Sequence, residues 1–386
     1  MQAPRKAAAN RLRTPPLASS PHPGVGTKKL SLLLLASLLA VVLNGCSGVP
    51  VLPAQEKKTE MRVLFAGSLI LPFDDLEHAF EEQHPDVDVL MEGHGSIQCI
   101  RQVTELERLA DVIAVADYSL IPLLMYETSD PETGEPYADW TLQFATNELG
   151  LAYTDGSAYA EEINTDNWYE ILSRPDLVFG ISDPRFDACG YRAMMLGQLA
   201  VAYYDEPDLF SELFSDRFTQ RVEVQHGQQG QHDDFDTILI PEVLRPVSES
   251  GLVMRGSSVQ LLGVLESGDL DYGFEYLSVS RQRDLNFLAL PEEINLSSEA
   301  HQENYSRARV KLAYQRFASV NPEFEGRTIH YGLTIPSNAP HPDLAVELIQ
   351  FLLGPDGQRI MAENHHPMIL PPMTDNEEAL PQRLRR

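Results

Sequence analysis

The sequence predicts an α/β protein of two lobes, each built on a mainly parallel sheet that helices cover. Short apolar strands and amphipathic helices alternate from residue 61 onward, a pattern typical of parallel sheets. The chain has 386 residues, which is long enough for two packed lobes of one architecture. A strand-like run over 144–153 is placed to cross from the first lobe to the second.

The individual elements follow from the spacing of apolar residues, which is near two in strands and near 3.6 in helices. We expect strands over 61–65, 87–91, 112–115, 177–181, 272–276 and 329–335. We expect helices over 72–80, 97–109, 191–204, 258–265 and 344–352. The polar segments 131–136 and 225–236 are expected to be loops.

The N-terminal residues predict export and anchoring. Lys28 and Lys29 precede an apolar run over 30–43, which is too short to span a bilayer as a folded anchor. The run ends in Leu-Asn-Gly before Cys46, which resembles the lipobox of bacterial lipoproteins. Residues 1–45 are therefore predicted to be a lipoprotein signal peptide, Cys46 an acylated residue and 46–60 a tether. Cys99 and Cys189 are the other two cysteines and are expected to stay unpaired.

The formal charge of −28 excludes one class of partner and constrains another. A chain this acidic repels nucleic acid, so no nucleic-acid partner is expected. It also repels a free anion at long range. An anion site would have to be built from local dipoles.

Two turns could supply such dipoles. Gly67-Ser68 and Gly95-Ser96 each follow a predicted strand and open a predicted helix. A helix N-terminus carries unpaired N–H groups and positive partial charge, and serine adds a hydroxyl donor. Two such turns at one sheet edge indicate an anion site. The alternative is that each serine is an ordinary helix cap.

Longer motifs resemble the archaeal-type tungstate/molybdate-binding proteins of ABC transporters. The matching runs are FAGSL at 65–69, ADVIAVADYSLI at 110–121, LESGDLDYGFEY at 265–276, LPEEINL at 290–296 and YGLTIP at 331–336. This resemblance covers residues 61–372 and implies a two-lobed, type II periplasmic-binding-protein-like fold with crossover hinge strands. Lobe 1 would comprise 61–148 plus 326–386, and lobe 2 would comprise 149–325. The chain departs from the family at Leu277, where a basic residue is common, and residues 126–137 and 225–236 look like insertions.

The resemblance also implies the site residues. Ser68 and Ser96 match serines that bind oxyanion oxygens, and Asp187 and Glu275 match carboxylates that complete the shell of the tungsten or molybdenum centre. Gly67, Ala188 and Cys189 would contribute backbone groups. No cofactor and no catalytic residue are implied. The expected partners are the oxyanion, ABC permease subunits and the membrane, with the protein itself a monomer.

The residues alone leave alternatives open. A carboxylate facing a dianion is repulsive unless it ligates a metal centre or accepts a proton from the ligand. Asp187 and Glu275 therefore argue against sulfate, whereas hydrogenphosphate remains a second candidate. A secreted hydrolase using Asp187 and Glu275 as an acid–base pair is a third.

We expect several histidines to have no role in ligand or metal binding. His94 is expected at the rim of the site, and His365-His366 is expected to face solvent. Four residues resemble a metal cluster but match no zinc spacing, and we interpret them as part of a polar loop: His226, His232, Asp233 and Asp234.

Overall fold

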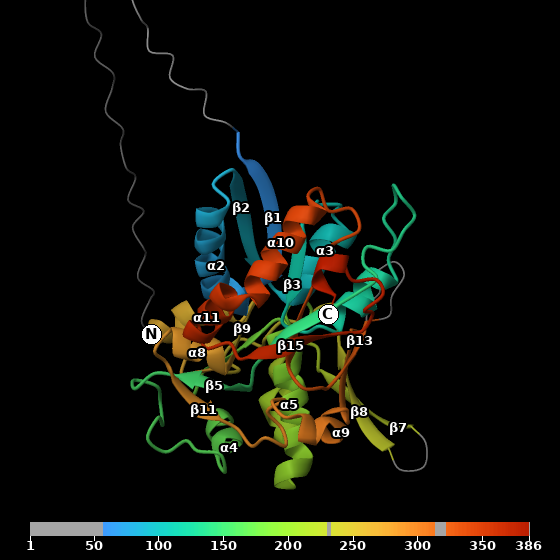
Figure 1. Ribbon diagram of the computed structural model, residues 1–386. Coiled ribbons are helices and arrows are strands. Elements are labelled where there is room, and N and C mark those ends of the chain that lie inside the picture. The colour runs from blue at the N-terminus through green and yellow to red at the C-terminus, as the bar shows by residue number, and fades with distance from the viewer. Residues whose placement is uncertain (1–56, 230–232, 313–321, 386) are drawn as a thin grey trace, which may run out of the picture. The chain divides into compact units, whose positions relative to one another are not determined.

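The computed structural model describes residues 57–229, 233–312 and 322–385, which form two lobes stacked on each other (Figure 1). The predicted α/β class is confirmed. Within the described residues, no helix is both long enough and apolar enough to span a bilayer. The predicted signal peptide, Cys46 and most of the tether lie outside the described residues.

Lobe 1 is built on a six-stranded sheet with the order β15-β4-β14-β3-β1-β2. Its strands are β1 (Thr59–Ala66), β2 (Val87–His94), β3 (Val112–Val115), β4 (Leu142–Thr146), β14 (His330–Thr334) and β15 (Met368–Thr374). Its helices are α2 (Ile70–Gln83), α3 (Ser96–Thr104), α10 (Pro342–Leu353) and α11 (Pro355–Glu363), with short turns η1 (Gly67–Leu69), η2 (Pro122–Tyr126) and η5 (Gln382–Leu384).

Lobe 2 contains two sheets, of order β11-β5-β10-β6-β9 and β13-β12-β8-β7. The first consists of β5 (Leu149–Tyr153), β6 (Phe179–Ser182), β9 (Leu252–Arg255), β10 (Tyr272–Tyr276) and β11 (Asn286–Ala289). The second consists of β7 (Glu223–Gln229), β8 (Asp233–Ile240), β12 (Ala308–Leu312) and β13 (Glu323–Glu325). The helices are α4 (Trp168–Leu172), α5 (Ala188–Tyr204), α6 (Leu209–Leu213), α7 (Val259–Glu266), α8 (Leu277–Gln282) and α9 (Gln302–Tyr305), with η3 (Ser215–Arg217) and η4 (Glu299–His301).

Both main sheets are mixed, with a parallel part and an antiparallel part. Strand β1 pairs in parallel with β2 and β3, whereas β14, β4 and β15 continue the sheet with antiparallel pairs. In lobe 2, β10, β6 and β9 are parallel, and β5 and β11 are antiparallel additions. The carboxyl ends of the parallel strands lead into α3, α5 and α8, and ligands bind at such ends.

The run over 144–153 is two strands in different lobes. β4 ends at Thr146 and β5 begins at Leu149, so Asn147 and Glu148 carry the chain from one lobe to the other. Glu148 also accepts a backbone hydrogen bond from Leu277 at the start of α8. The crossover is therefore held by lobe 2 on one side and continuous with the lobe 1 sheet on the other.

Two predicted elements differ from the structure. Helix α3 ends at Thr104 instead of continuing to residue 109, and Leu106 and Leu109 are exposed. The cause is the left-handed backbone of Glu107, with φ of 52°, which no α-helix accommodates. The segment 225–236 is not a loop, because its described residues belong to the β7–β8 hairpin. Strand β8 also pairs with β12, which supplies the tertiary context that a polar sequence does not reveal.

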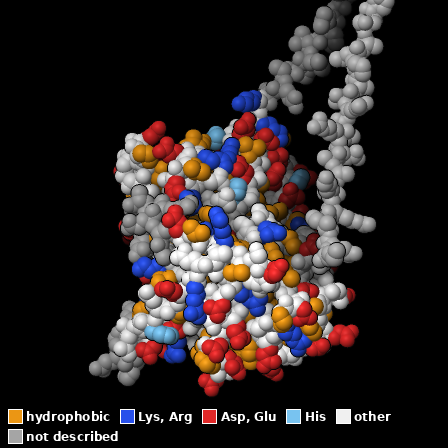
Figure 2. All heavy atoms as spheres, turned by 180° about the vertical axis from the view of Figure 1, so that it is seen from behind, with side chains coloured by type: hydrophobic (Ala, Val, Ile, Leu, Met, Phe, Trp, Pro, Cys, Tyr) orange, Lys and Arg blue, Asp and Glu red, His pale blue; other side chains and the backbone are white. Residues whose placement is uncertain are grey.

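The surface is acidic over much of its extent. Figure 2 shows Asp and Glu side chains spread across one face, with Lys and Arg scattered among them. This distribution agrees with the formal charge of −28. Long-range attraction of an anion is therefore absent, and any anion site depends on groups at short range.

Candidate functional site

The two predicted carboxylates both accept hydrogen bonds from one serine, Ser258. Asp187 is the N-cap of α5, and Glu275 lies in β10 next to the start of α8. The Ser258 N–H donates to Asp187 Oδ2 at 2.8 Å, and the Ser258 hydroxyl donates to Glu275 Oε1 at 3.0 Å. Ser258 was expected only as the first residue of the predicted helix 258–265. Its position at the start of α7 was visible in the sequence, but its bridging of two distant carboxylates was not.

Both carboxylates are buried, and no ion pair reaches either of them within the described residues. Glu275 is 2% exposed, and its Oε2 has no hydrogen-bond partner. Burial raises the pKa of Glu275 to about 8, although the Tyr276 N–H and the Ser258 hydroxyl partly oppose this rise. Burial also raises the pKa of Asp187. An ionised carboxylate is costly in such a place, so the protonated form of Glu275 is favoured in the closed structure unless a group from outside the chain compensates the charge.

The two predicted serines lie in lobe 1, and neither is a helix cap. Ser68 is in the short turn η1, where its Oγ lies 2.8 Å from the Tyr331 hydroxyl. Ser96 is the first residue of α3, after the N-cap Gly95, and its Oγ accepts the Ala116 N–H at 3.1 Å. Because that N–H can only donate, the Ser96 hydroxyl hydrogen remains available for a ligand.

Close backbone contacts bring the serine turns of lobe 1 against the carboxylates of lobe 2. A side chain at Gly95 would collide with the carbonyl of Phe186 at 2.4 Å and with Asp187 Cβ at 3.2 Å. The N–H of Ile97 donates to the same carbonyl at 3.1 Å. A side chain at Gly67 would lie 3.1 Å from Val259, the residue after Ser258. Glycine is therefore required at Gly95, and a side chain at Gly67 would have to displace Val259, because the lobes meet at both turns.

We call this region the junction; it consists of Ser68, Ser96, Asp187, Ser258 and Glu275, all of them at most 6% exposed. Three helices of eight or more residues begin at it, α3, α5 and α7, and their N-termini carry positive partial charge. The predicted backbone contributors also lie here, with Gly67 in η1 and Ala188 and Cys189 in the first turn of α5. The structure thus gathers every predicted site residue of 57–385, while their role in binding an anion stays a prediction.

A second polar contact joins the lobes beside the junction. The Arg192 guanidinium of α5 donates to the Ala116 carbonyl at 2.7 Å and lies 3.4 Å from Asp117 Oδ2. The Tyr191 hydroxyl donates to the same Asp117 oxygen at 2.6 Å. We call Asp117, Tyr191 and Arg192 the interlobe latch. It was not predicted, although Asp117 lies in the quoted motif at 110–121.

The charge of the interlobe latch is balanced. Burial alone would raise the pKa of Asp117, but Arg192 and Arg327, together with hydrogen bonds from Tyr191 and Ser119, hold it below its usual range. Arg192 also donates to the Tyr276 hydroxyl at 2.9 Å, which ties it to the residue beside Glu275. This carboxylate is therefore ionised and satisfied by the protein itself.

The remaining predictions have mixed outcomes. Cys99 and Cys189 are buried and unpaired, as expected. His94 is partly exposed and lies 3.7 Å from Glu92. His365 is exposed, but the prediction for His366 was wrong because that ring is buried against Ser278 and Tyr331.

The suspected metal cluster gains no support. His226 is exposed and contacts Asp236, and His232 lies outside the described residues. Among 57–229, 233–312 and 322–385, no group of three or more His, Cys, Asp or Glu residues is arranged to hold a metal ion. The hairpin that carries these residues is therefore interpreted as structural.

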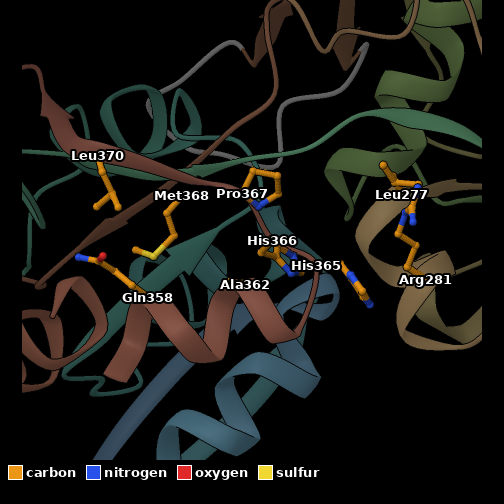
Figure 3. A pocket seen from close by; sticks show the side chains of 9 residues that line it. All are labelled: Leu277, Arg281, Gln358, Ala362, His365, His366, Pro367, Met368 and Leu370. Atoms are coloured by element: carbon orange, nitrogen blue, oxygen red, sulfur yellow. The ribbon is translucent and has the colours of Figure 1, made fainter. Parts of the chain in front are cut away.

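A surface cavity of about 490 Å³ lies away from the junction, between α8 and the α11–β15 segment (Figure 3). Leu277 and Arg281 line one side of it, and His365, Pro367 and Met368 line the other. Leu277, where the chain departs from the family pattern, therefore lines this cavity and is not one of the junction residues.

Known proteins share the sequence over most of its length. The family described as bacterial extracellular solute-binding protein matches residues 61–365. An uncharacterized solute-binding protein of Methanoculleus marisnigri is 37% identical over 347 residues, 88% of this chain and 92% of the relative. The molybdate/tungstate-binding protein WtpA of Thermococcus kodakarensis is 36% identical over 356 residues, 90% of this chain and 93% of that protein.

Solved structures agree on the fold. The substrate binding protein of an ABC transporter from Agrobacterium tumefaciens is 13% identical, with a TM-score of 0.50 over 83% of this chain and 82% of that one. At this identity the likeness supports the two-lobed architecture alone. The family and its relatives are binding proteins, so the hydrolase alternative is set aside. The chain belongs to the family of bacterial extracellular solute-binding proteins.

Proposed function

We propose that this protein captures tungstate or molybdate outside the cytoplasm and delivers it to an ABC importer. The observation that carries the proposal is Glu275 Oε2, which is buried beside Asp187 and has no hydrogen-bond partner; among the residues that the structure describes, no cation pairs with either carboxylate. Hexavalent tungsten or molybdenum accepts additional oxygen donors, so Asp187 and Glu275 can ligate the metal centre directly. Relatives that bear the name of this ligand support the choice.

The rest of the junction suits the oxygens of such an anion. The Ser68 and Ser96 hydroxyls donate from lobe 1, and the backbone of Gly67, Ala188 and Cys189 lies at turns and helix starts around them. These donors are uncharged, which fits a protein whose surface repels anions. Phosphate remains the second candidate, because hydrogenphosphate can donate its O–H to a carboxylate.

Ligand entry requires the lobes to separate. The junction side chains are at most 6% exposed, so in this closed arrangement no anion reaches them from solvent. We assign 61–148 plus 326–386 to one rigid lobe and 149–325 to the other, with hinge motion at the crossover segments. The closed monomer is the form that the permease subunits would recognise.

The membrane anchor forms part of the proposal. Acylation of Cys46, after removal of residues 1–45, would hold the protein near its permease through the tether 46–60. Cys46→Ala should release the protein from membranes or block its processing. A variant that is processed at the same site and sediments with membranes like wild type would remove this assignment.

Native mass spectrometry of the purified protein tests the ligand. The intact complex should carry the added mass of one tungstate or molybdate, and the mass should disappear after unfolding and refolding in anion-free buffer. Recovery of a phosphate adduct in medium that also contains tungstate would favour the second candidate.

A further inference from the structure

Tyr331 and Asn147 lie behind Ser68 in a buried hydrogen-bonded chain. The Ser68 Oγ and the Tyr331 hydroxyl are 2.8 Å apart, and Asn147 Nδ2 lies 3.1 Å from the same hydroxyl. Asn147 Nδ2 also lies 2.7 Å from the Ser278 Oγ. All four side chains are at most 6% exposed, so each hydrogen bond is made in a dry environment where its direction matters.

The direction of this chain follows from the backbone around Asn147. The Asn147 Oδ1 accepts the Glu148 N–H at 3.1 Å and the Ser278 N–H at 3.3 Å. A flipped amide would place its NH₂ group against these two donors, so the orientation is fixed. Asn147 Nδ2 therefore donates to the Tyr331 hydroxyl, which leaves the hydrogen of that hydroxyl free to be donated onward to Ser68.

The consequence falls on Ser68. Its oxygen accepts the Tyr331 hydrogen, so its own hydrogen is free to point at a ligand, as that of Ser96 is at the second turn. Such a serine favours a ligand oxygen that carries no proton. We propose that Tyr331 and Asn147 are positioning residues that fix Ser68 as a hydrogen-bond donor and thereby favour unprotonated oxyanions over protonated ones. This inference rests on the proposed function of the junction.

This series of hydrogen bonds begins at Asn147, in the crossover between the lobes. Asn147 lies between β4 and β5, whereas Ser278 belongs to α8 in lobe 2 and Tyr331 belongs to β14 in lobe 1. The donor direction at Ser68 is therefore set by residues of both lobes together. An opening motion that moves Ser278 away from Asn147 would weaken the chain at the same time as it exposes the site.

Tyr331→Phe tests the proposal without a large change in shape. Loss of the hydroxyl leaves Ser68 able to turn, so tungstate affinity should fall roughly tenfold, the size of one hydrogen bond to a charged group. Hydrogenphosphate should lose much less, because its O–H can now donate to the freed Ser68 oxygen. The readout is the ratio of the two dissociation constants by calorimetry, which a general loss of structure would not move.

Controls separate the possible failures. Tyr272→Phe removes another buried tyrosine hydroxyl, one that donates to the Ala158 carbonyl, and should leave both affinities unchanged. Asn147→Asp replaces the donating NH₂ by an acceptor and should reverse the chain, with a larger loss for tungstate than Tyr331→Phe. Equal losses for both anions, or no loss of tungstate affinity, would overturn the proposal. A wild-type protein that binds phosphate but not tungstate would contradict the proposed function and not this inference. In that case the Tyr331→Phe variant should keep its affinity for phosphate, and a large loss of that affinity would overturn the inference.

Discussion

Two sets of buried carboxylates lie where the lobes meet, and they differ in whether the protein supplies a cation for them. At the interlobe latch, Asp117 receives hydrogen bonds from Tyr191 and Ser119 and faces Arg192, and its pKa is held below the usual range. At the junction, Asp187 and Glu275 are equally buried but receive only neutral donors, and burial raises both pKa values. The first group is complete without a ligand, and the second is not.

This difference indicates that one set of carboxylates stabilises the closed arrangement of the lobes and the other set binds the ligand. A buried carboxylate with its own cation stabilises one arrangement of the lobes, whatever lies between them. A buried carboxylate without a cation disfavours that arrangement until an electrophilic centre arrives. The latch and the junction therefore act on the same closed form with opposite sign, and substitutions in the two regions should have separable effects.

Substitution of the junction carboxylates should have the largest effect. In Glu275→Gln or Asp187→Asn the amide is a poor ligand for the metal centre, so tungstate affinity should fall roughly 100-fold, as for removal of one member of a buried charged contact. The ligand-free protein should lose no stability, because the amide replaces a carboxyl group whose ionised form burial disfavours. Calorimetry and thermal unfolding measure the two quantities.

A control for these variants is Glu148→Gln. Burial raises the pKa of Glu148 too, but its side chain belongs to the crossover and has no hydrogen bond to Ser258. Its affinity for tungstate should equal that of wild type. If both junction variants bind tungstate as tightly as wild type, direct ligation by these carboxylates is wrong.

Substitution in the interlobe latch should have a smaller effect of a different kind. Asp117→Asn leaves Arg192 buried without a counter-charge when the lobes close, so the closed form becomes less populated and apparent affinity should fall roughly tenfold. The ligand-free melting midpoint should barely change, because open lobes hydrate both groups. Faster ligand release measured by stopped flow would accompany the loss.

The Arg309–Glu325 ion pair provides the comparison for the latch. These residues are 3.2 Å apart within the small sheet of lobe 2, so Glu325→Gln should not alter affinity. A ligand-free Asp117→Asn protein that melts early while binding tungstate normally would show that the latch supports one lobe and not closure.

The smallest expected effect is proton release on binding. Glu275 has a pKa of about 8 in the closed structure, above its ordinary value of 4.5, so it keeps its proton between those limits. If the ligand-free protein is closed and Glu275 ligates the metal as a carboxylate, binding near neutral pH must release that proton, and affinity should rise with pH until about 8. Asp117 has a lowered pKa and stays ionised throughout this range, so the latch contributes no proton.

Calorimetry in two buffers with different ionisation enthalpies measures the released proton. The difference in heat should vanish in Glu275→Gln. No difference in wild type would mean that Glu275 stays protonated and donates to the anion instead of ligating its centre.

Regular apolar spacing predicted most of the fold because each element carries its own signal. β10 and α10 were found in this way, and the turns at Ser68 and Ser96 were visible as glycine and serine between a strand and a helix. Asp187 and Glu275 came from the family resemblance and not from spacing. A carboxylate beside a helix start looks the same in the sequence whether or not a cation faces it.

The missed residues all act through partners far away in the chain. Ser258 contacts Asp187 across 71 positions, and Tyr191 contacts Asp117 across 74. His366 was expected in solvent because two adjacent histidines look polar, yet packing of α8 and β14 lowers its pKa to about 4 by burial. Such contacts depend on tertiary packing within and between the lobes, which no local pattern encodes.

The central claim is tested most directly by anion-dependent thermal unfolding of protein that has been unfolded and refolded free of anions. The pH should exceed the Glu275 pKa of about 8, since a protonated Glu275 could donate to any oxyanion. Tungstate or molybdate at about 100-fold excess over its dissociation constant should raise the melting midpoint by roughly 5–10 °C. Phosphate should give a smaller shift, and sulfate should give almost none. A phosphate shift larger than the tungstate shift would contradict the account.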